Sequence, residues 1–125
     1  MLMPRTLCDH NVPFILTLSL PGYDITHASQ LGWQELSNGR LLTAAEETGF
    51  DVLITADQNI QHQQNLTGRK LALIVLDTNH WPTLKPHLDS IKAAIVRVEV
   101  GGYLPVAFPR LPLKRRVFDP GNDQP

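Results

Sequence analysis

The sequence has a single cysteine, Cys8, among its 125 residues. One cysteine excludes an internal disulfide and fits a protein of the reducing cytoplasm. No apolar run approaches the length of a membrane span, and the polar first five residues are too few to head a signal peptide. We therefore expect a cytoplasmic protein with no membrane partner.

The sequence also lacks a strong net charge, a glycine-rich phosphate loop and the His-x3-His spacing of a helical zinc pair. Because the formal net charge is -1, any binding to nucleic acid must depend on a local surface. Hydrophobic residues at 42% and charged residues at 18% are typical of a folded globular domain. We expect one domain over residues 1–108, followed by a proline-rich, basic tail over 109–125 that is flexible or contacts a partner.

Three apolar segments are each followed by the pattern Asp-x-Asn. The three patterns are Asp9-His10-Asn11, Asp57-Gln58-Asn59 and Asp77-Thr78-Asn79. The second follows Val52-Leu53-Ile54, a short apolar run of the kind found in strands that are buried on both faces. This repeated pattern is the strongest signal in the sequence.

Strand-like and helix-like segments alternate along the chain, which predicts a three-layer α/β/α sandwich with a mainly parallel central sheet. We expect strands at 6–8, 23–27, 52–55, 71–76 and, as an edge strand, 103–108. Helices are expected after Pro13, from Ser37 to Gly49, at about 59–66, and as one longer helix from near Pro82. Pro86 either falls inside the first turn of this last helix or marks a later start. With the strands numbered along the chain, the expected order is 3-2-1-4, with the fifth strand beside the fourth.

The alternation of strands and helices also predicts which acidic residues lie at the same edge of the sheet. Asp9, Asp57 and Asp77 directly follow strands, and Glu35 precedes a helix, so these four lie at the carboxyl edge of the predicted sheet. Clustered carboxylates imply a cation, and oxygen ligands without cysteine favour Mg²⁺ or Mn²⁺. Such an ion activates water and neutralises charge on a transferring phosphoryl group. The alternative is that each Asp-x-Asn only caps a helix, since both residue types are favoured caps.

Other polar residues are candidates for supporting roles. Thr55 is placed to hydrogen-bond Asp57 or a phosphate, although a β-branched residue is also expected in a strand. Arg69-Lys70 is a candidate for contacts with nucleic acid, although short basic runs are usually solvated surface. Cys8 lies inside a strand and is interpreted as a core residue. The supporting polar residues that we predict are Asn11, Asn38, Thr55 and Asn59.

At these residues the chain resembles the short bacterial PIN-like proteins, relatives of the VapC toxins. The resemblance spans roughly residues 7–95 and is carried, in order, by Cys8-Asp9-His10-Asn11-Val12-Pro13, Gly32-Trp33-Gln34-Glu35-Leu36-Ser37-Asn38-Gly39-Arg40-Leu41-Leu42, Val52-Leu53-Ile54-Thr55-Ala56-Asp57-Gln58-Asn59 and Gln63-Gln64-Asn65. It implies a PIN-type α/β/α fold and a Mg²⁺- or Mn²⁺-dependent ribonuclease with Asp9 and Asp57 as metal ligands. It also implies a small antitoxin protein that blocks the site.

The chain departs from this family at two places. Relatives often carry an acid where this chain has His10, and they tend to place acids in the segment 37–40, which has none here. Asn38 in that segment offers an amide oxygen, which is a weaker metal ligand than a carboxylate.

Two functions follow as hypotheses. The first is a metal-dependent endoribonuclease, the toxin of a type II toxin–antitoxin pair, with Asp9, Asp57 and Asp77 as catalytic residues and Glu35 as a further metal ligand. The second is a catalytically silent PIN-like module that binds a partner protein or RNA, which the missing acids around Asn38 favour. A homodimer is compatible with both.

Overall fold

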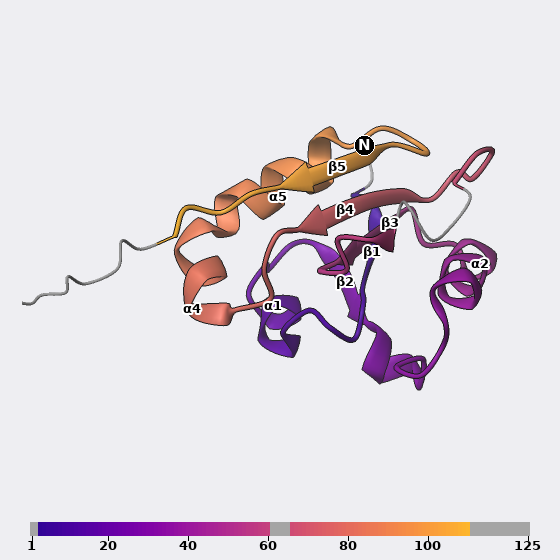
Figure 1. The fold of residues 1–125 in the computed structure, drawn as a ribbon, viewed down its shortest axis with the longest axis horizontal. Helices are drawn as coiled ribbons and strands as arrows, with labels where there is room; N and C mark the ends of the chain where they lie inside the picture. Colours follow the sequence, from indigo (N-terminus) through magenta and orange to yellow (C-terminus); the bar gives the residue numbers. More distant parts are fainter. Residues whose placement is uncertain (1–2, 61–65, 111–125) are drawn as a thin grey trace, which may run out of the picture.

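The computed structural model describes residues 3–60 and 66–110, and Figure 1 shows its arrangement. Five parallel strands form one sheet in the order β2-β1-β3-β4-β5. The predicted helix at 59–66 falls mostly outside the described residues. So does the tail beyond Arg110 that was predicted to be flexible or to contact a partner.

The middle of the sheet is its most apolar part. Strands β3 (Val52–Thr55) and β4 (Ala72–Leu76) are buried at every position, because helices or loops cover both faces. Strand β1 (Arg5–Cys8) is exposed only at its first residue. The edge strands β2 (Asp24–His27) and β5 (Tyr103–Val106) are partly exposed, as edges of a sheet are expected to be.

The helices begin and end where local chemistry predicts. Helix α1 (Phe14–Leu18) follows Pro13, and a 3-10 turn, η1 (Ala28–Leu31), follows β2. Helix α2 (Asn38–Thr48) is capped by the Ser37 side chain, which accepts a hydrogen bond from the Arg40 N–H. It ends at Gly49, whose φ of 94° is readily adopted only by glycine.

The single long helix expected from near Pro82 is instead three consecutive pieces. These are α4 (Trp81–Leu84), the 3-10 turn η2 (Lys85–His87) and α5 (Leu88–Arg97). Pro86 has no N–H to donate to the preceding turn, so regular α-helical hydrogen bonding is interrupted there. The long helix thus begins only after Pro86, at Leu88, which is the later of the two starts that the sequence predicted.

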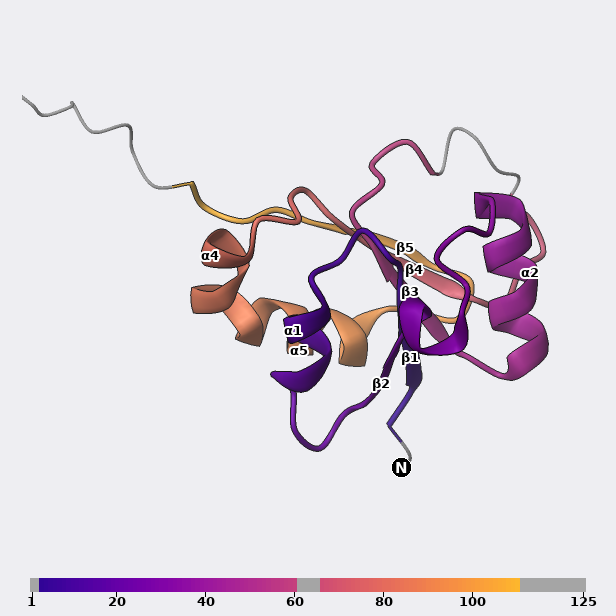
Figure 2. The same cartoon turned by 90° about the horizontal axis from the view of Figure 1, so that it is seen from below.

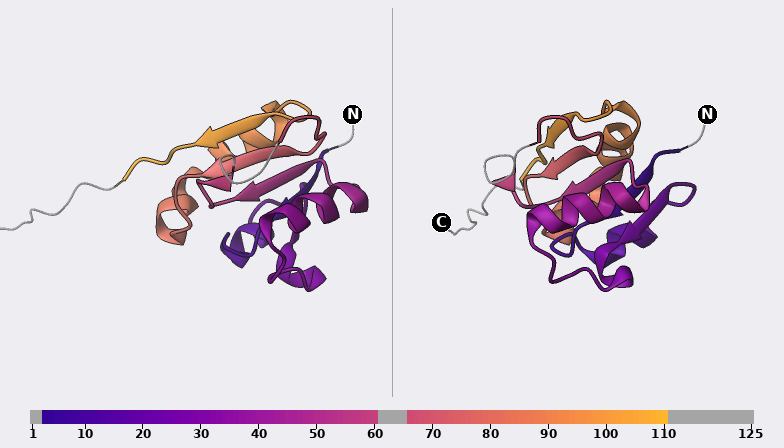
Figure 3. Two further views of the ribbon diagram at one scale, coloured as in Figure 1. Left: turned by 45° about the vertical axis from the view of Figure 1, so that its right-hand side comes forward. Right: turned by 90° about the vertical axis from the view of Figure 1, so that its right-hand side faces the viewer.

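Helices cover both faces of the sheet, which confirms the predicted α/β class with a parallel sheet. One hydrophobic cluster joins α1, α4 and α5 to one face, and a second joins α2 to the other. Figure 2 shows α1, α4 and α5 on one side of the strands and α2 on the opposite side, and Figure 3 shows α2 crossing its face. Cys8 is fully buried in the first cluster, and burial raises the pKa of its thiol to about 12, so it is a core residue.

The predicted strand order 3-2-1-4 was wrong, because β3 lies between β1 and β4. Connections of one hand that lie on the same face move in the same direction along a sheet, and those on opposite faces move in opposite directions. Since α1 and α2 lie on opposite faces, the chain reverses after β2 and passes β1 to form β3. The fifth strand does pair with the fourth, as predicted.

The last connection is unusual. The β4–α5–β5 connection moves in the same direction as the β2–α2–β3 connection, yet α5 covers the opposite face. The two connections therefore have opposite hands, although such connections share one hand in about 98% of cases. The C-terminal part of the domain consequently packs beside α1 and not beside α2.

The amino edge of the sheet holds a hydrogen-bonded group around Glu46. Its carboxylate accepts hydrogen bonds from the N–H groups of Lys70 (2.9 Å) and Leu71 (3.3 Å), and it pairs with the Arg69 guanidinium. Burial by itself raises the pKa of Glu46, but the hydrogen bonds from Leu71, Lys70 and Arg69 outweigh it and lower the pKa below its ordinary value of 4.5. The charged form of Glu46 therefore stabilises the folded chain.

Replacing Glu46 by glutamine is expected to lower the free energy of unfolding at pH 7 by about 1–3 kcal/mol. A carboxylate whose pKa is depressed on folding contributes stability above its unfolded pKa and loses it as the pH falls through the folded pKa. The difference between wild type and Glu46→Gln should therefore be full at neutral pH and shrink below pH 4.5. Urea unfolding at several pH values measures it. Glu47→Gln, at the exposed neighbouring position, is the control, and an equal loss in both variants would contradict the assignment.

Candidate functional site

The strand order places a change in the direction of winding at the carboxyl ends of β1 and β3. The chain runs one way from β1 to β2 and the other way from β2 to β3, so the direction of winding switches between these two strands. In open parallel sheets, ligands bind outside the carboxyl ends of the strands at such a switch point. Asp9 directly follows β1, and Thr55 is the last residue of β3. The polar residues described below therefore lie where this fold class binds ligands.

Asp9 is a buried acid at this switch point. Only 3% of its surface is exposed, and its N–H donates to the Ile54 carbonyl at 2.8 Å, which extends the pairing of β1 with β3. Its Oδ2 accepts the Thr55 hydroxyl at 2.8 Å. Its Oδ1 accepts the His10 N–H at 2.7 Å and lies 3.0 Å from His10 Nδ1. Hydrogen bonding thus compensates the burial of this carboxyl group.

Thr55 connects the first Asp-x-Asn pattern to the second. Its hydroxyl donates to Asp9 and accepts the N–H of Asp57 at 3.1 Å. Asn11 reinforces this connection, because its Oδ1 accepts the Ala56 N–H at 3.0 Å and its amide lies 3.4 Å from the Thr55 hydroxyl. The loops after β1 and β3 are therefore held together by side chains that the sequence predicted as supporting residues.

Asp57 is partly exposed and is fixed from two directions. Its Oδ1 accepts the Asn59 N–H at 3.0 Å, which is the hydrogen bond of an Asx turn. Its Oδ2 accepts Asn38 Nδ2 at 2.9 Å, and Asn38 is the first residue of α2. The structure thus brings Asp9, Asn11, Asn38, Thr55, Asp57 and Asn59 into one hydrogen-bonded group, which we call the switch-point cluster.

Asp77 has different partners. Both of its carboxylate oxygens lie 3.3 Å from the Phe108 N–H, and Arg110 Nη1 lies 3.4 Å from Oδ1. Its backbone carbonyl accepts Gln58 Nε2 at 2.9 Å and Arg110 Nη2 at 3.2 Å. Asp77 therefore lies at the predicted carboxyl edge, but its carboxylate binds the segment that follows β5.

The remaining candidates lie outside the switch-point cluster. Glu35 is exposed in the loop before α2, and no hydrogen bond joins it to the cluster within the described chain. Arg69 and Lys70 precede β4 and lie at the amino edge, where Arg69 pairs with Glu46. These two basic residues are thus at the edge opposite the cluster.

The donor set limits the metal that this site is able to hold. Within residues 3–60 and 66–110, no group of three or more His, Cys, Asp or Glu side chains is arranged to hold a metal ion. Asp9 and Asp57 are two carboxylates with lone pairs beyond those used in their hydrogen bonds. Mg²⁺ typically binds through one or two carboxylates and keeps several waters. The oxygen donors of Asp9 and Asp57 are thus of the type that a hydrated Mg²⁺ or Mn²⁺ takes, and Asp77 and Glu35 do not join them in the cluster as the sequence predicted.

Two features of the site were missed by reasoning from the sequence. His10 was not among the residues predicted for the site, yet its ring contacts the buried Asp9 carboxylate. Arg110 was assigned to the tail, yet it contacts Asp77 at the carboxyl edge. No local pattern marks either residue, although His10 is the residue at which the chain departs from the PIN-like pattern.

Comparison of the chain with protein-family models, with curated proteins and with solved structures found no match. In the described part of the chain, every helix is too short or too polar to cross a bilayer.

Proposed function

We propose that this chain is a Mg²⁺- or Mn²⁺-dependent endoribonuclease with a PIN-like fold, the toxin of a type II toxin–antitoxin pair. One observation carries the proposal: Asp9 and Asp57, which follow two neighbouring strands, are joined at the switch point of a parallel sheet by Thr55, whose hydroxyl donates to the Asp9 carboxylate and accepts the Asp57 N–H. The resemblance of the surrounding segments to PIN-like proteins supports the choice of RNA as substrate and of an antitoxin as partner.

In this proposal Asp9 and Asp57 hold the metal ion, which when bound lowers the pKa of water and neutralises charge on the phosphate. Thr55 keeps the Asp9 carboxylate in a fixed orientation by donating to its Oδ2. Asn38 and the Asn59 N–H do the same for the two oxygens of Asp57. The chain thus contributes a pair of acids that is already oriented before the substrate binds.

The second candidate is a catalytically silent module that binds RNA or a protein partner. The contacts of Asp77 favour it, because Phe108 and Arg110 engage the carboxylate that was expected to be the third acid. A site with two acids binds a metal ion more weakly than a site with three. The nuclease and the silent module therefore differ in whether the chain cleaves RNA at the metal concentration of a cell.

Incubation of the purified chain with a structured RNA tests the proposal. We expect cleavage with Mn²⁺ or Mg²⁺ and none with EDTA, because the two acids alone do not supply a nucleophilic water. Cleavage that is unchanged in EDTA would contradict the metal-dependent assignment. Binding of the RNA without cleavage at any Mn²⁺ concentration would instead support the silent module.

A further inference from the structure

We propose that Arg110 is a phosphate-binding residue of this chain, held at the carboxyl edge by Asp77 and directed at the backbone of a bound RNA. The inference rests on the proposed function, since it names a residue that the RNA contacts near Asp57. It gives the segment after β5 a role in the site.

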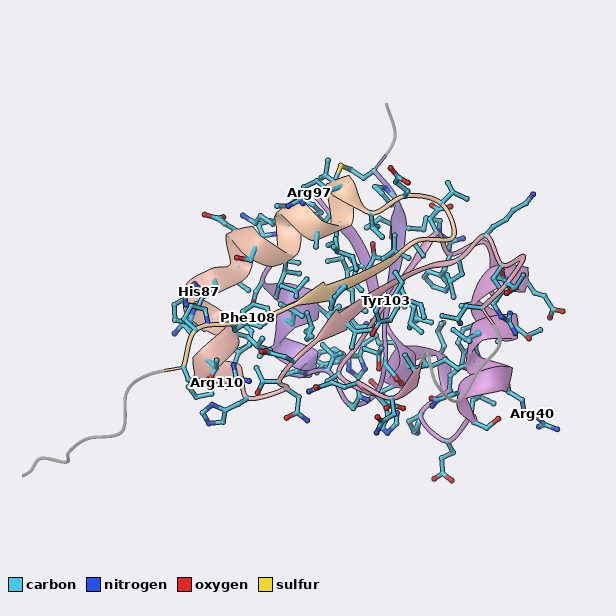
Figure 4. The ribbon with its side chains drawn as sticks, turned by 45° about the horizontal axis from the view of Figure 1, so that its top comes forward. Arg40, His87, Arg97, Tyr103, Phe108 and Arg110 are labelled. Carbon is cyan, nitrogen blue, oxygen red and sulfur yellow. The ribbon has the colours of Figure 1, made fainter. Side chains whose placement is uncertain are left out.

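The first step is the anchor that brings Arg110 to the edge. Phe108 is 4% exposed and belongs to the hydrophobic cluster of α1, α4 and α5. Its ring centroid lies 6.4 Å from that of His87, at the end of η2. Its N–H donates to the Asp77 carboxylate. The chain leaving β5 is therefore fixed two residues before Arg110, and Figure 4 shows His87, Phe108 and Arg110 at the same end of the molecule.

The second step is the state of the guanidinium. Arg110 Nη1 donates to the Phe108 carbonyl at 2.8 Å and to Asp77 Oδ1 at 3.4 Å, and Nη2 donates to the Asp77 carbonyl at 3.2 Å. These bonds use three of the five N–H groups of an arginine. The side chain remains 50% exposed. Within the described chain, Nε–H and one Nη2–H are thus available for an anion, and guanidinium groups bind phosphate through two such donors.

The third step places this guanidinium beside the switch-point cluster. Gln58 directly follows Asp57, and its Nε2 donates to the same Asp77 carbonyl that accepts Arg110 Nη2. The Asp77 carbonyl therefore connects Arg110 to Gln58, and Gln58 is the chain neighbour of Asp57. In the proposal, an RNA bound at Asp57 therefore reaches Arg110 with a nearby phosphate of its backbone.

The fourth step is the charge of the sequence that follows. Lys114-Arg115-Arg116 come four residues after Arg110, so the basic residue at the edge begins a basic stretch of sequence. A polyanion such as RNA is able to interact with several of these basic residues at once, whereas a single inorganic phosphate needs only one of them. RNA is therefore the occupant to which the proposal commits.

Fluorescence anisotropy of a labelled structured RNA tests the proposal, in EDTA so that no cleavage occurs. Arg110→Gln is expected to weaken binding about tenfold and to reduce the slope of log affinity against log salt concentration by about 1. Arg110→Lys keeps the charge and loses the fork geometry, so it should keep the salt slope with an intermediate affinity. A merely structural arginine would not change the salt slope.

Arg97→Gln is the matched control, because it removes the same charge from the exposed last turn of α5. It should bind RNA as the wild type does. Equal affinity and salt slope for wild type, Arg110→Gln and Arg97→Gln would overturn the role of Arg110 and leave the proposed nuclease intact. Failure of the wild type itself to bind RNA in EDTA would reject the role of Arg110, and the cleavage assay with Mn²⁺ decides the proposed nuclease separately. Thermal melts of the variants verify folding, and Arg110→Lys supplies the second measurement if Arg110→Gln does not fold.

Discussion

Replacement of Asp57 by asparagine is expected to lower Mn²⁺-dependent RNA cleavage by at least about a hundredfold. A metal ion contributes several kcal/mol to stabilising the transition state, and each 1.36 kcal/mol lost is about a factor of ten in rate. The fold should remain, because asparagine keeps the oxygen that accepts the Asn59 N–H. The variant thus removes the charge with little change in shape.

Initial rates of cleavage over a range of Mn²⁺ concentrations measure this loss. Asp89→Asn is the matched control, since that carboxylate is fully exposed on α5 and its only recorded partner in the described chain is Lys92. It should cleave RNA at the wild-type rate. If Asp57→Asn and Asp89→Asn are equally active, Asp57 is not a metal ligand and its hydrogen bonds serve only the turn after β3.

Replacement of Ile54 by alanine is expected to lower the free energy of unfolding by about 2–5 kcal/mol. Ile54 is fully buried in β3 and is flanked in register by Cys8 of β1 and Ile74 of β4. Truncation removes apolar contacts and leaves a cavity between two strands and the α1–α5 layer, where the backbone ladder restricts relaxation. Because Ile54 immediately precedes Thr55, its loss is also expected to loosen the switch-point cluster.

Urea unfolding gives the change from the shift in midpoint at constant slope. Val96→Ala is the control, because Val96 is 61% exposed on α5 and a surface substitution of this kind changes stability by about 0.5 kcal/mol or less. Similar losses in the two variants would mean that Ile54 does not lie in the core.

The position of the elements could be predicted from the sequence, but their order in the sheet could not. The apolar run before Thr55 and the Ser37 cap both have local causes, and both are where the pattern put them. The order of the strands depends on which face each connecting helix covers. The amphipathic pattern of α1 or α2 shows that one side of the helix is buried, but it does not show which face of the sheet that side contacts. No local sequence pattern could therefore distinguish the expected order 3-2-1-4 from the observed one.

The dependence on strand order and on distant segments also explains which site residues could be predicted from the sequence. A parallel sheet was enough to place Asp9 and Asp57 at the same carboxyl edge, but their connection through Thr55 also needed β1 and β3 to be neighbours, which the expected order 3-2-1-4 did not make them. The partners of Asp77 are Phe108 and Arg110, more than thirty residues away along the chain, and no periodicity connects them. Arg69 was predicted as a contact for nucleic acid because of its charge, but in the fold it pairs with Glu46.

The two edge strands determine whether the sheet is able to pair with a strand from another chain. Gly102 and Val106 direct their carbonyls at β4, so by the alternation of a strand the backbone of Pro105 faces outward. A proline on that side presents no N–H to an incoming strand, which blocks the ladder at its middle. The outer edge of β5 is therefore protected against strand addition by other chains, so self-association of this domain through its sheet is restricted to the edge formed by β2.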